Sequence, residues 1–134
     1  MNVIAKVMVS GAPRPIAPFS HACWAGDFLF LTGQMPIDPN TGTYVAGPIE
    51  QQTRRVLENL LTVLTDQHLS LAEVVSVRAY LTDMDDYDNF NREYQAFFGS
   101  VALPARTCIG VTGLAGGAAV EIDFVAYKQN HTPV

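Results

Sequence analysis

The stretch that most restricts the fold of this 134-residue chain runs from Pro48 to Leu64. Charged and amide side chains fill one side of its helical projection, and apolar side chains recur every three or four residues on the other. Pro48 suits the first turn, where its missing N–H is not needed. The stripe that faces inward consists of Ile49, Thr53, Val56, Leu57, Leu60, Leu61 and Leu64. Such a helix must bury its stripe against another layer, and we expect that layer to be a β-sheet.

Alternating patterns on both sides of this helix predict the strands of that sheet. Residues 21–32 predict a β-hairpin, because apolar and aromatic residues occupy every second position on either side of a Gly26–Asp27 turn. Further strands are expected over residues 74–81, 106–111 and 120–127. The last two are joined by the glycine-rich turn 113–117, which lacks the Lys-Ser/Thr of a phosphate-binding loop.

A second helix is expected between the strand over residues 74–81 and the strand over residues 106–111. Asp85 or Asp86 is predicted to cap it, and Gly99 to end it. Its aromatic stripe, which we assign to the core, comprises Tyr87, Phe90, Tyr94, Phe97 and Phe98. The order of elements predicts an α+β fold, with a mixed β-sheet and two helices packed on one face. The length favours a single domain spanning residues 1–134.

Composition indicates that part of the surface is covered by another copy of the chain. Only 16% of the residues are charged, against about 25% in typical soluble domains, while 49% are hydrophobic. We therefore expect self-association. The alternative is a monomer with an unusually apolar surface.

Charge and motif content argue against several classes of function. The net charge is −5 and the eight basic residues are scattered, so we expect no nucleic-acid partner. No window approaches the roughly 20 apolar residues of a membrane span, and the start of the chain does not resemble a secretion signal. We therefore expect no membrane association and a cytoplasmic protein whose Cys23 and Cys108 are reduced. The histidines, at positions 21, 68 and 131, form no metal-binding pattern.

Arg106 and Glu121 are the two charged residues that call for an explanation, because both lie in strands expected to be buried. We expect their strands to be neighbours in the sheet, so that the two side chains could meet. One interpretation is then a structural ion pair at the rim of the sheet or at a subunit contact. The other is a site for a small carboxylic acid, since a guanidinium binds a carboxylate through two parallel hydrogen bonds and a nearby carboxylate can polarise a water.

Cys108 follows Arg106 by two residues and therefore shares its face of the strand. A nucleophilic cysteine needs a base such as histidine, and none is near it in sequence. We interpret Cys108 as a small residue lining whatever Arg106 contacts.

Five short motifs, in order and at matching spacing, give the chain a family resemblance over roughly residues 15–127. The chain resembles the reactive intermediate deaminases, the RidA-like proteins. The matching motifs are Ile16-Ala-Pro-Phe-Ser20, Gly33-Gln-Met-Pro36, Asn91-Arg-Glu-Tyr94 leading into Phe97-Phe98, Pro104-Ala-Arg106 and Val120-Glu-Ile122. The resemblance implies a chorismate-mutase-like fold that assembles as a homotrimer, with sites in the clefts between subunits.

The same resemblance implies a reaction and roles for particular residues. Such proteins hydrolyse 2-enamine and 2-imine acids to 2-keto acids and ammonium, without metal or cofactor. Arg106 is then expected to bind the substrate carboxylate, and Glu121 to hold the attacking water with help from main-chain groups near Cys108. The regions of Phe19 and Gly33 are expected to shape the pocket from the facing subunit.

One departure from the family pattern bears on the substrate. The chain has Phe19 where the family commonly has tyrosine, and His21 where it often has glutamine. Because a missing phenol hydroxyl changes which ligands a pocket accepts, the 2-aminomuconate deaminases are an alternative, with His21 supplying a hydrogen-bond donor or a proton. A further alternative is a trimeric small-molecule-binding protein that turns nothing over; the presence of Glu121 favours catalysis.

Overall fold

The computed structural model describes residues 3–129. Its elements follow one another as β1 (Ile4–Val7), β2 (Ala22–Ala25), β3 (Phe28–Gln34), α1 (Ile49–Asp66), β4 (Val74–Leu81), α2 (Tyr87–Phe98), β5 (Ala105–Gly110) and β6 (Val120–Tyr127). Single 3-10 turns lie at Leu71–Glu73, Met84–Asp86 and Ala115–Gly117. The predicted helices and strands are confirmed to within about two residues. Strand β1 is an addition, since its four residues are too few to show an alternating pattern.

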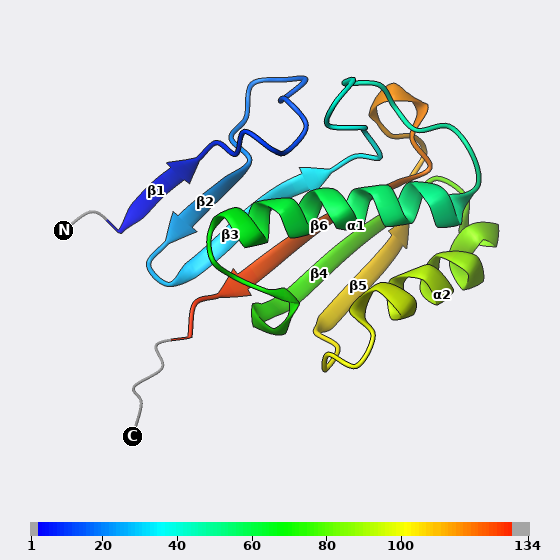
Figure 1. Ribbon diagram of the computed structural model, residues 1–134. Coiled ribbons are helices and arrows are strands. Elements are labelled where there is room, and N and C mark those ends of the chain that lie inside the picture. The colour runs from blue at the N-terminus through cyan, green and yellow to red at the C-terminus, as the bar shows by residue number, and fades with distance from the viewer. Residues whose placement is uncertain (1–2, 130–134) are drawn as a thin grey trace.

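The six strands form one mixed sheet in the order β1-β2-β3-β6-β4-β5 (Figure 1). Neighbouring strands run antiparallel, except that β4 and β5 are parallel. The crossover through α2 returns the chain to the outer edge of β4, and β6 then enters the gap between β3 and β4. As a result β4 separates β5 from β6, so the expectation that Arg106 and Glu121 lie on neighbouring strands is wrong.

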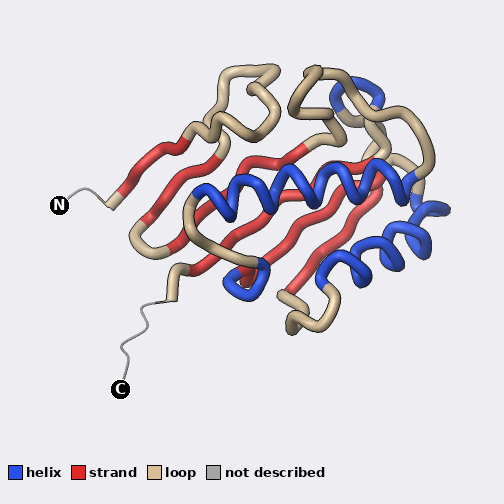
Figure 2. Tube along the Cα trace, in the orientation of Figure 1, coloured by secondary structure: helices blue, strands red, loops and turns tan. Residues whose placement is uncertain are grey.

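Both helices cover the same face of the sheet, as predicted (Figures 1 and 2). The core between the layers is formed by the predicted stripe of α1, apart from the partly buried Leu61, and by alternate residues of the central strands. Val77 on β4 and Phe124 on β6, for example, are 0% and 1% exposed. Phe90 and Phe98 of α2 complete it. The predicted core assignment of the α2 stripe is confirmed for these residues and Tyr94, whereas Tyr87 is 37% exposed.

The helix caps differ in part from the prediction. Pro48 stands just before α1 rather than inside it. Asp86 precedes α2 without a side-chain capping bond, and Asp83 accepts the Asp85 N–H at 2.9 Å to cap the preceding 3-10 turn instead. Gly99 ends α2 with a φ of 60°, a conformation that glycine adopts at little cost.

The second face of the sheet has no helix over it within residues 3–129 (Figure 2). It carries exposed apolar side chains from three strands: Phe28 and Phe30 of β3, Ile109 of β5 and Tyr127 of β6. Large apolar side chains gathered on one face are typical of a surface that contacts another molecule.

Candidate active site

Arg106 lies on the helix-covered side of the edge strand β5. In the register of the sheet it pairs with Val77, a core residue, and its guanidinium carbon lies 4.9 Å from the ring centroid of Tyr94, 5.4 Å from that of Phe90 and 5.8 Å from that of Tyr87. These distances are typical of cation–π contacts. The aromatic stripe of α2 therefore holds the cation as well as filling the core, a role that helical spacing alone did not reveal.

The rings of Tyr87, Phe90 and Tyr94 form a cradle around the Arg106 guanidinium and leave most of its N–H donors free. Within residues 3–129 its one hydrogen bond is from Nη2 to the Tyr87 hydroxyl, at 3.2 Å, and it has no ion-pair partner. Burial raises the pKa of the Tyr94 phenol to about 12, despite the opposing effect of the Arg106 cation. Tyr94 is therefore a neutral wall, and Arg106 is a fixed cation with donors to spare for an anion.

Cys108 lies on the same face as Arg106, next to the buried Ala79 of β4. Burial raises the pKa of its thiol, and the Arg106 cation offsets this only in part. A neutral thiol is a poor nucleophile. The location is consistent with the interpretation of Cys108 as a lining residue.

Glu121 lies on the opposite face of the sheet. It alternates along β6 with Val120 and Ile122, whose side chains are fully buried in the core, and it pairs with Tyr80. A Cβ added to Gly33 would overlap the Glu121 carboxylate, so the absence of a side chain at Gly33 lets this carboxylate lie against β3. Among the described residues Glu121 has no ion-pair partner.

The surroundings of Glu121 disfavour its charged form. Burial raises the pKa of the carboxyl, and the neighbouring Asp123 carboxylate raises it further. Asp123 itself is occupied, since Arg78 Nε lies 3.0 Å from its Oδ1 and the Tyr80 hydroxyl donates to its Oδ2 at 3.3 Å. A partly buried carboxyl with a raised pKa and no cationic partner is suited to general base chemistry.

Phe19 and Gly33 line one small hollow, together with Ile16 and Ile37. The Phe19 side chain is 39% exposed. Gly33 connects this hollow to Glu121, so three of the predicted site residues gather around the end of β3.

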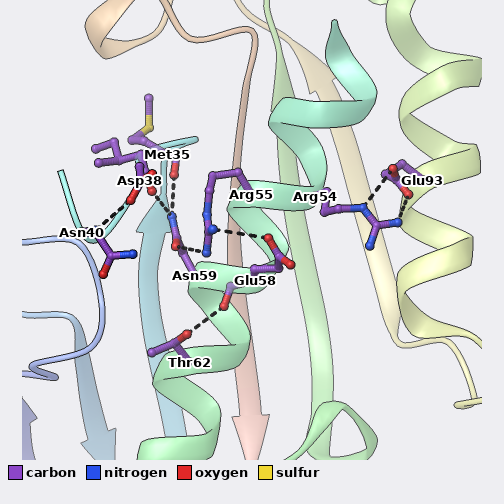
Figure 3. Close-up of polar contacts among 10 residues, drawn as sticks. Met35, Asp38, Asn40, Arg54, Arg55, Glu58, Asn59, Thr62 and Glu93 are labelled. Atoms are coloured by element: carbon purple, nitrogen blue, oxygen red, sulfur yellow. Dashed lines mark hydrogen bonds and ion pairs between the residues drawn. The ribbon is translucent and has the colours of Figure 1, made fainter. Parts of the chain in front are cut away.

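The polar face of α1 fastens the segment that follows Gly33 (Figure 3). Asn59, which is 1% exposed, donates from Nδ2 to the carbonyl oxygens of Met35 and Ile37 at 3.1 and 2.9 Å. Arg55 Nη2 in turn donates to Asn59 Oδ1 at 3.0 Å. The buried Asn59 amide thus has partners for both its oxygen and its nitrogen, and it fixes the loop of Met35 and Ile37 behind the hollow.

His21 belongs neither to the residues around Arg106 nor to those around Glu121. It is 3% exposed; its Nδ1 accepts the Val9 N–H at 2.8 Å, and its Nε2 donates to the Pro13 carbonyl at 2.7 Å. Both ring nitrogens are therefore used in holding the segment before β2. This corrects the prediction of His21 as a substrate-binding residue, because a buried ring with both nitrogens bonded has nothing left to offer a ligand.

His21→Ala is expected to lower the free energy of unfolding by roughly 2–4 kcal/mol, because it leaves a buried N–H and a buried carbonyl without partners. The activity per folded molecule should not change. Urea denaturation followed by tryptophan fluorescence measures the difference. The matched control is His68→Asn, at an exposed position whose φ of 61° asparagine tolerates. A His21→Ala chain as stable as the control would contradict the structural role.

Glu121→Gln is expected to raise the melting temperature at pH 7. Because its folded pKa is raised, Glu121 holds its proton more tightly in the folded state, so stability falls as pH rises through the interval above the ordinary value of 4.5. The neutral amide of the variant does not lose stability in this way. The difference in melting temperature between variant and parent should therefore vanish once the pH is below that ordinary value. Thermal melts between pH 4 and 8, with Asp66→Asn at the exposed end of α1 as control, test the sign. A lower melting temperature at pH 7 would be the contrary result.

Two half-sites thus occupy opposite faces of one sheet. Arg106 and Cys108 lie on the helix-covered face, on β5. Glu121 points to the opposite face from β6, on the other side of β4 in the strand order, and Gly33 and Phe19 gather near it at the end of β3. One small molecule cannot touch both groups in a single chain.

The rest of residues 3–129 offers no second candidate catalytic or metal-binding group. A hollow of about 590 Å³ between residues 9–11 and the outer side of α1 contains none of the predicted site residues. Residues 3–129 bring no three histidine, cysteine or acidic side chains into a metal-binding cluster; His131 lies outside the described residues. Cys23 and Cys108 are free thiols. None of the helices of residues 3–129 is long and apolar enough to cross a membrane.

Fold and site together define a small α+β protein with a candidate binding place for a small anion. The sequence profile of the family described as Endoribonuclease L-PSP matches residues 9–128. A RutC family protein of Pyrococcus horikoshii is 44% identical over 123 residues, which cover 92% of this chain and 97% of that protein. Protein DfrA of Myxococcus xanthus is 41% identical over 117 residues, covering 86% and 88%.

Solved structures agree with these sequence matches. YyfA of Yersinia pestis, a protein of the conserved Rid family, is 33% identical and superposes with a TM-score of 0.89, covering 92% of this chain and 98% of its own. TdcF of Escherichia coli with bound serine is 28% identical with a TM-score of 0.88, covering 93% and 99%. The chain belongs to the Endoribonuclease L-PSP family, to which the RutC and Rid proteins also belong, and the predicted RidA-like relationship is confirmed.

Proposed function

We propose that this chain hydrolyses 2-imino acids and their enamine tautomers to 2-keto acids and ammonium, using Arg106 to bind the carboxylate and Glu121 to activate water. The observation that carries the proposal is the contrast between these two charged groups. Arg106 is held by three aromatic rings with most of its donors unused, and Glu121 is a carboxyl with a raised pKa and no cationic partner among residues 3–129.

The reaction needs only these groups and water. An enamine first takes a proton from solvent at C3 and becomes the iminium form of the same acid. Glu121 accepts a proton from water as the water oxygen forms a bond to C2 and the C=N π electrons move to nitrogen. The protonated Glu121 then returns its proton to the amine, the C2–N bond breaks, and ammonia leaves, taking up a proton from the new hydroxyl as the 2-keto group forms. A carboxyl with a raised pKa is suited to both transfers.

The two half-sites favour a site shared between copies of the chain. Since Arg106 and Glu121 face opposite sides of the sheet, we infer that the cleft forms where the β5 side of one subunit meets the Glu121 face of the next, in a homotrimer. The uncovered sheet face, with Phe28, Phe30 and Ile109 exposed, supports this inference, because an apolar face of this kind is stabilised by burial against another copy.

Two further observations support the substrate class. TdcF, a structural relative, binds serine, which carries the α-carboxylate that Arg106 is proposed to hold. The net charge of −5 and the ion pairs of Arg54, Arg55 and Arg78 with acidic side chains do not favour the nucleic-acid substrate that the family name, Endoribonuclease L-PSP, suggests.

The test is a coupled assay in which a serine/threonine dehydratase releases 2-aminoacrylate or 2-aminocrotonate and the decay of the imine is followed. Faster decay with this protein supports the proposal. No acceleration, with turnover of 2-aminomuconate instead, would assign the narrower substrate that Phe19 suggests. Binding of 2-keto acids without turnover of any of these would leave a binding protein.

A further inference from the structure

Tyr87 stands at the solvent side of the Arg106 cradle. It is the first residue of α2 and is 37% exposed, whereas Phe90 and Tyr94, the other two rings of the cradle, are 0% and 4% exposed. The buried rings form the floor under the guanidinium. Tyr87 is the ring that a ligand arriving from solvent meets together with the cation.

The Tyr87 hydroxyl is poised to donate a hydrogen bond outward. Its oxygen accepts from Arg106 Nη2 at 3.2 Å, which fixes the position of the hydroxyl beside the guanidinium. Its own proton has no acceptor among residues 3–129. A hydroxyl whose oxygen is bonded to a cation is also a stronger donor, since hydrogen bonds in a chain polarise one another.

A carboxylate bound by Arg106 offers the acceptor that is missing. Its two oxygens accept about four hydrogen bonds, and the guanidinium edge supplies two of them. The phenol next to Nη2 lies beside the edge at which such a carboxylate docks. Residue 19, which is expected to shape the pocket from the facing subunit, is phenylalanine and supplies no hydroxyl of its own.

We propose that the Tyr87 hydroxyl is a substrate-binding group that donates a hydrogen bond to the carboxylate held by Arg106. This inference rests on the proposed function, since it requires Arg106 to receive a carboxylate. It makes the receptor a pair of residues from β5 and α2. The pair also discriminates between ligands, because a phenol donor bonds a charged carboxylate more strongly than a neutral amide in the same place.

The test compares Tyr87→Phe with two other variants of the full chain. Tyr87→Phe keeps the ring under the guanidinium and removes only the hydroxyl. Thr65→Val is the control, since it removes one hydroxyl from an exposed residue on the outer side of α1, away from the uncovered face of the sheet. Arg106→Ala tests the receptor itself. Dissociation constants for pyruvate and for pyruvamide, its neutral analogue, are measured by ligand-observed NMR titration, with thermal melts to verify folding.

Tyr87→Phe is expected to weaken pyruvate binding about 10-fold, the low end of the loss for a hydrogen bond to a charged group, and to change pyruvamide binding far less. Thr65→Val should match the parent for both. If Arg106→Ala weakens pyruvate binding and Tyr87→Phe does not, the role of Tyr87 is overturned and the proposed function stands. Equal losses for pyruvate and pyruvamide would also overturn it, since they indicate a merely structural effect. If Arg106→Ala binds pyruvate as well as the parent, the proposed function fails with it.

Discussion

Glu121→Gln is expected to slow imine hydrolysis by about 10²–10⁴-fold, the usual contribution of a positioned general base. The amide has nearly the same shape as the carboxylate and can still lie against Gly33, but it cannot accept a proton from water. Binding of the 2-keto acid product should change little, because Arg106 on the other half-site holds the carboxylate. The split between lost turnover and retained binding is what separates an enzyme from a binding protein.

The dehydratase-coupled assay measures the rate, and an NMR titration with pyruvate measures binding. Asp66→Asn is the matched control, since it makes the same carboxylate-to-amide change at an exposed position at the end of α1, away from β6. Turnover by Glu121→Gln at the rate of the parent would remove Glu121 from the mechanism.

The second large effect is expected from Arg106→Ala. Loss of a charge-assisted contact from arginine costs roughly 1.5–3 kcal/mol, which weakens 2-keto acid binding by about 10- to 150-fold and lowers kcat/KM at least as much. Arg106→Lys should recover only part of this loss, because an ammonium keeps the charge but lacks the planar pair of donors.

Arg92→Ala is the control for this variant, since Arg92 is an exposed arginine of α2 whose contact is with Asn89 on the same helix. Titration with pyruvate gives the affinities directly. If Arg106→Ala and Arg92→Ala bind pyruvate equally well, Arg106 is a structural cation held by aromatic rings and not a carboxylate receptor.

Local patterns in the sequence were sufficient for the elements but not for their order in the sheet. The stripe of α1 and the alternation in β4 and β6 depend on burial of each segment, which leaves a period in the sequence. The insertion of β6 between β3 and β4 depends on pairing between distant segments, and such pairing leaves no periodic pattern in the sequence. The wrong placement of Arg106 beside Glu121 followed directly from that missing information.

The candidate site shows the same division. The types of residue at Arg106, Glu121 and Gly33 pointed to a carboxylate site, and the structure supplies a chemical environment for each. His21 looked like a proton donor in sequence, but its contacts with Val9 and Pro13 depend on how the segment before β2 folds back. Tyr87 was assigned to the core because helical spacing does not tell the end of a buried stripe from its middle.

The most direct test of the account is the coupled assay on hetero-oligomers made by coexpressing the Arg106→Ala and Glu121→Gln chains. If each cleft takes Arg106 from one subunit and Glu121 from the next, an intact cleft forms wherever a Glu121→Gln chain supplies the arginine and an Arg106→Ala chain supplies the carboxylate. About one quarter of the interfaces in an equal mixture should then be active, so the mixture should recover about that fraction of the parent rate. A mixture no faster than either variant alone would contradict the shared site.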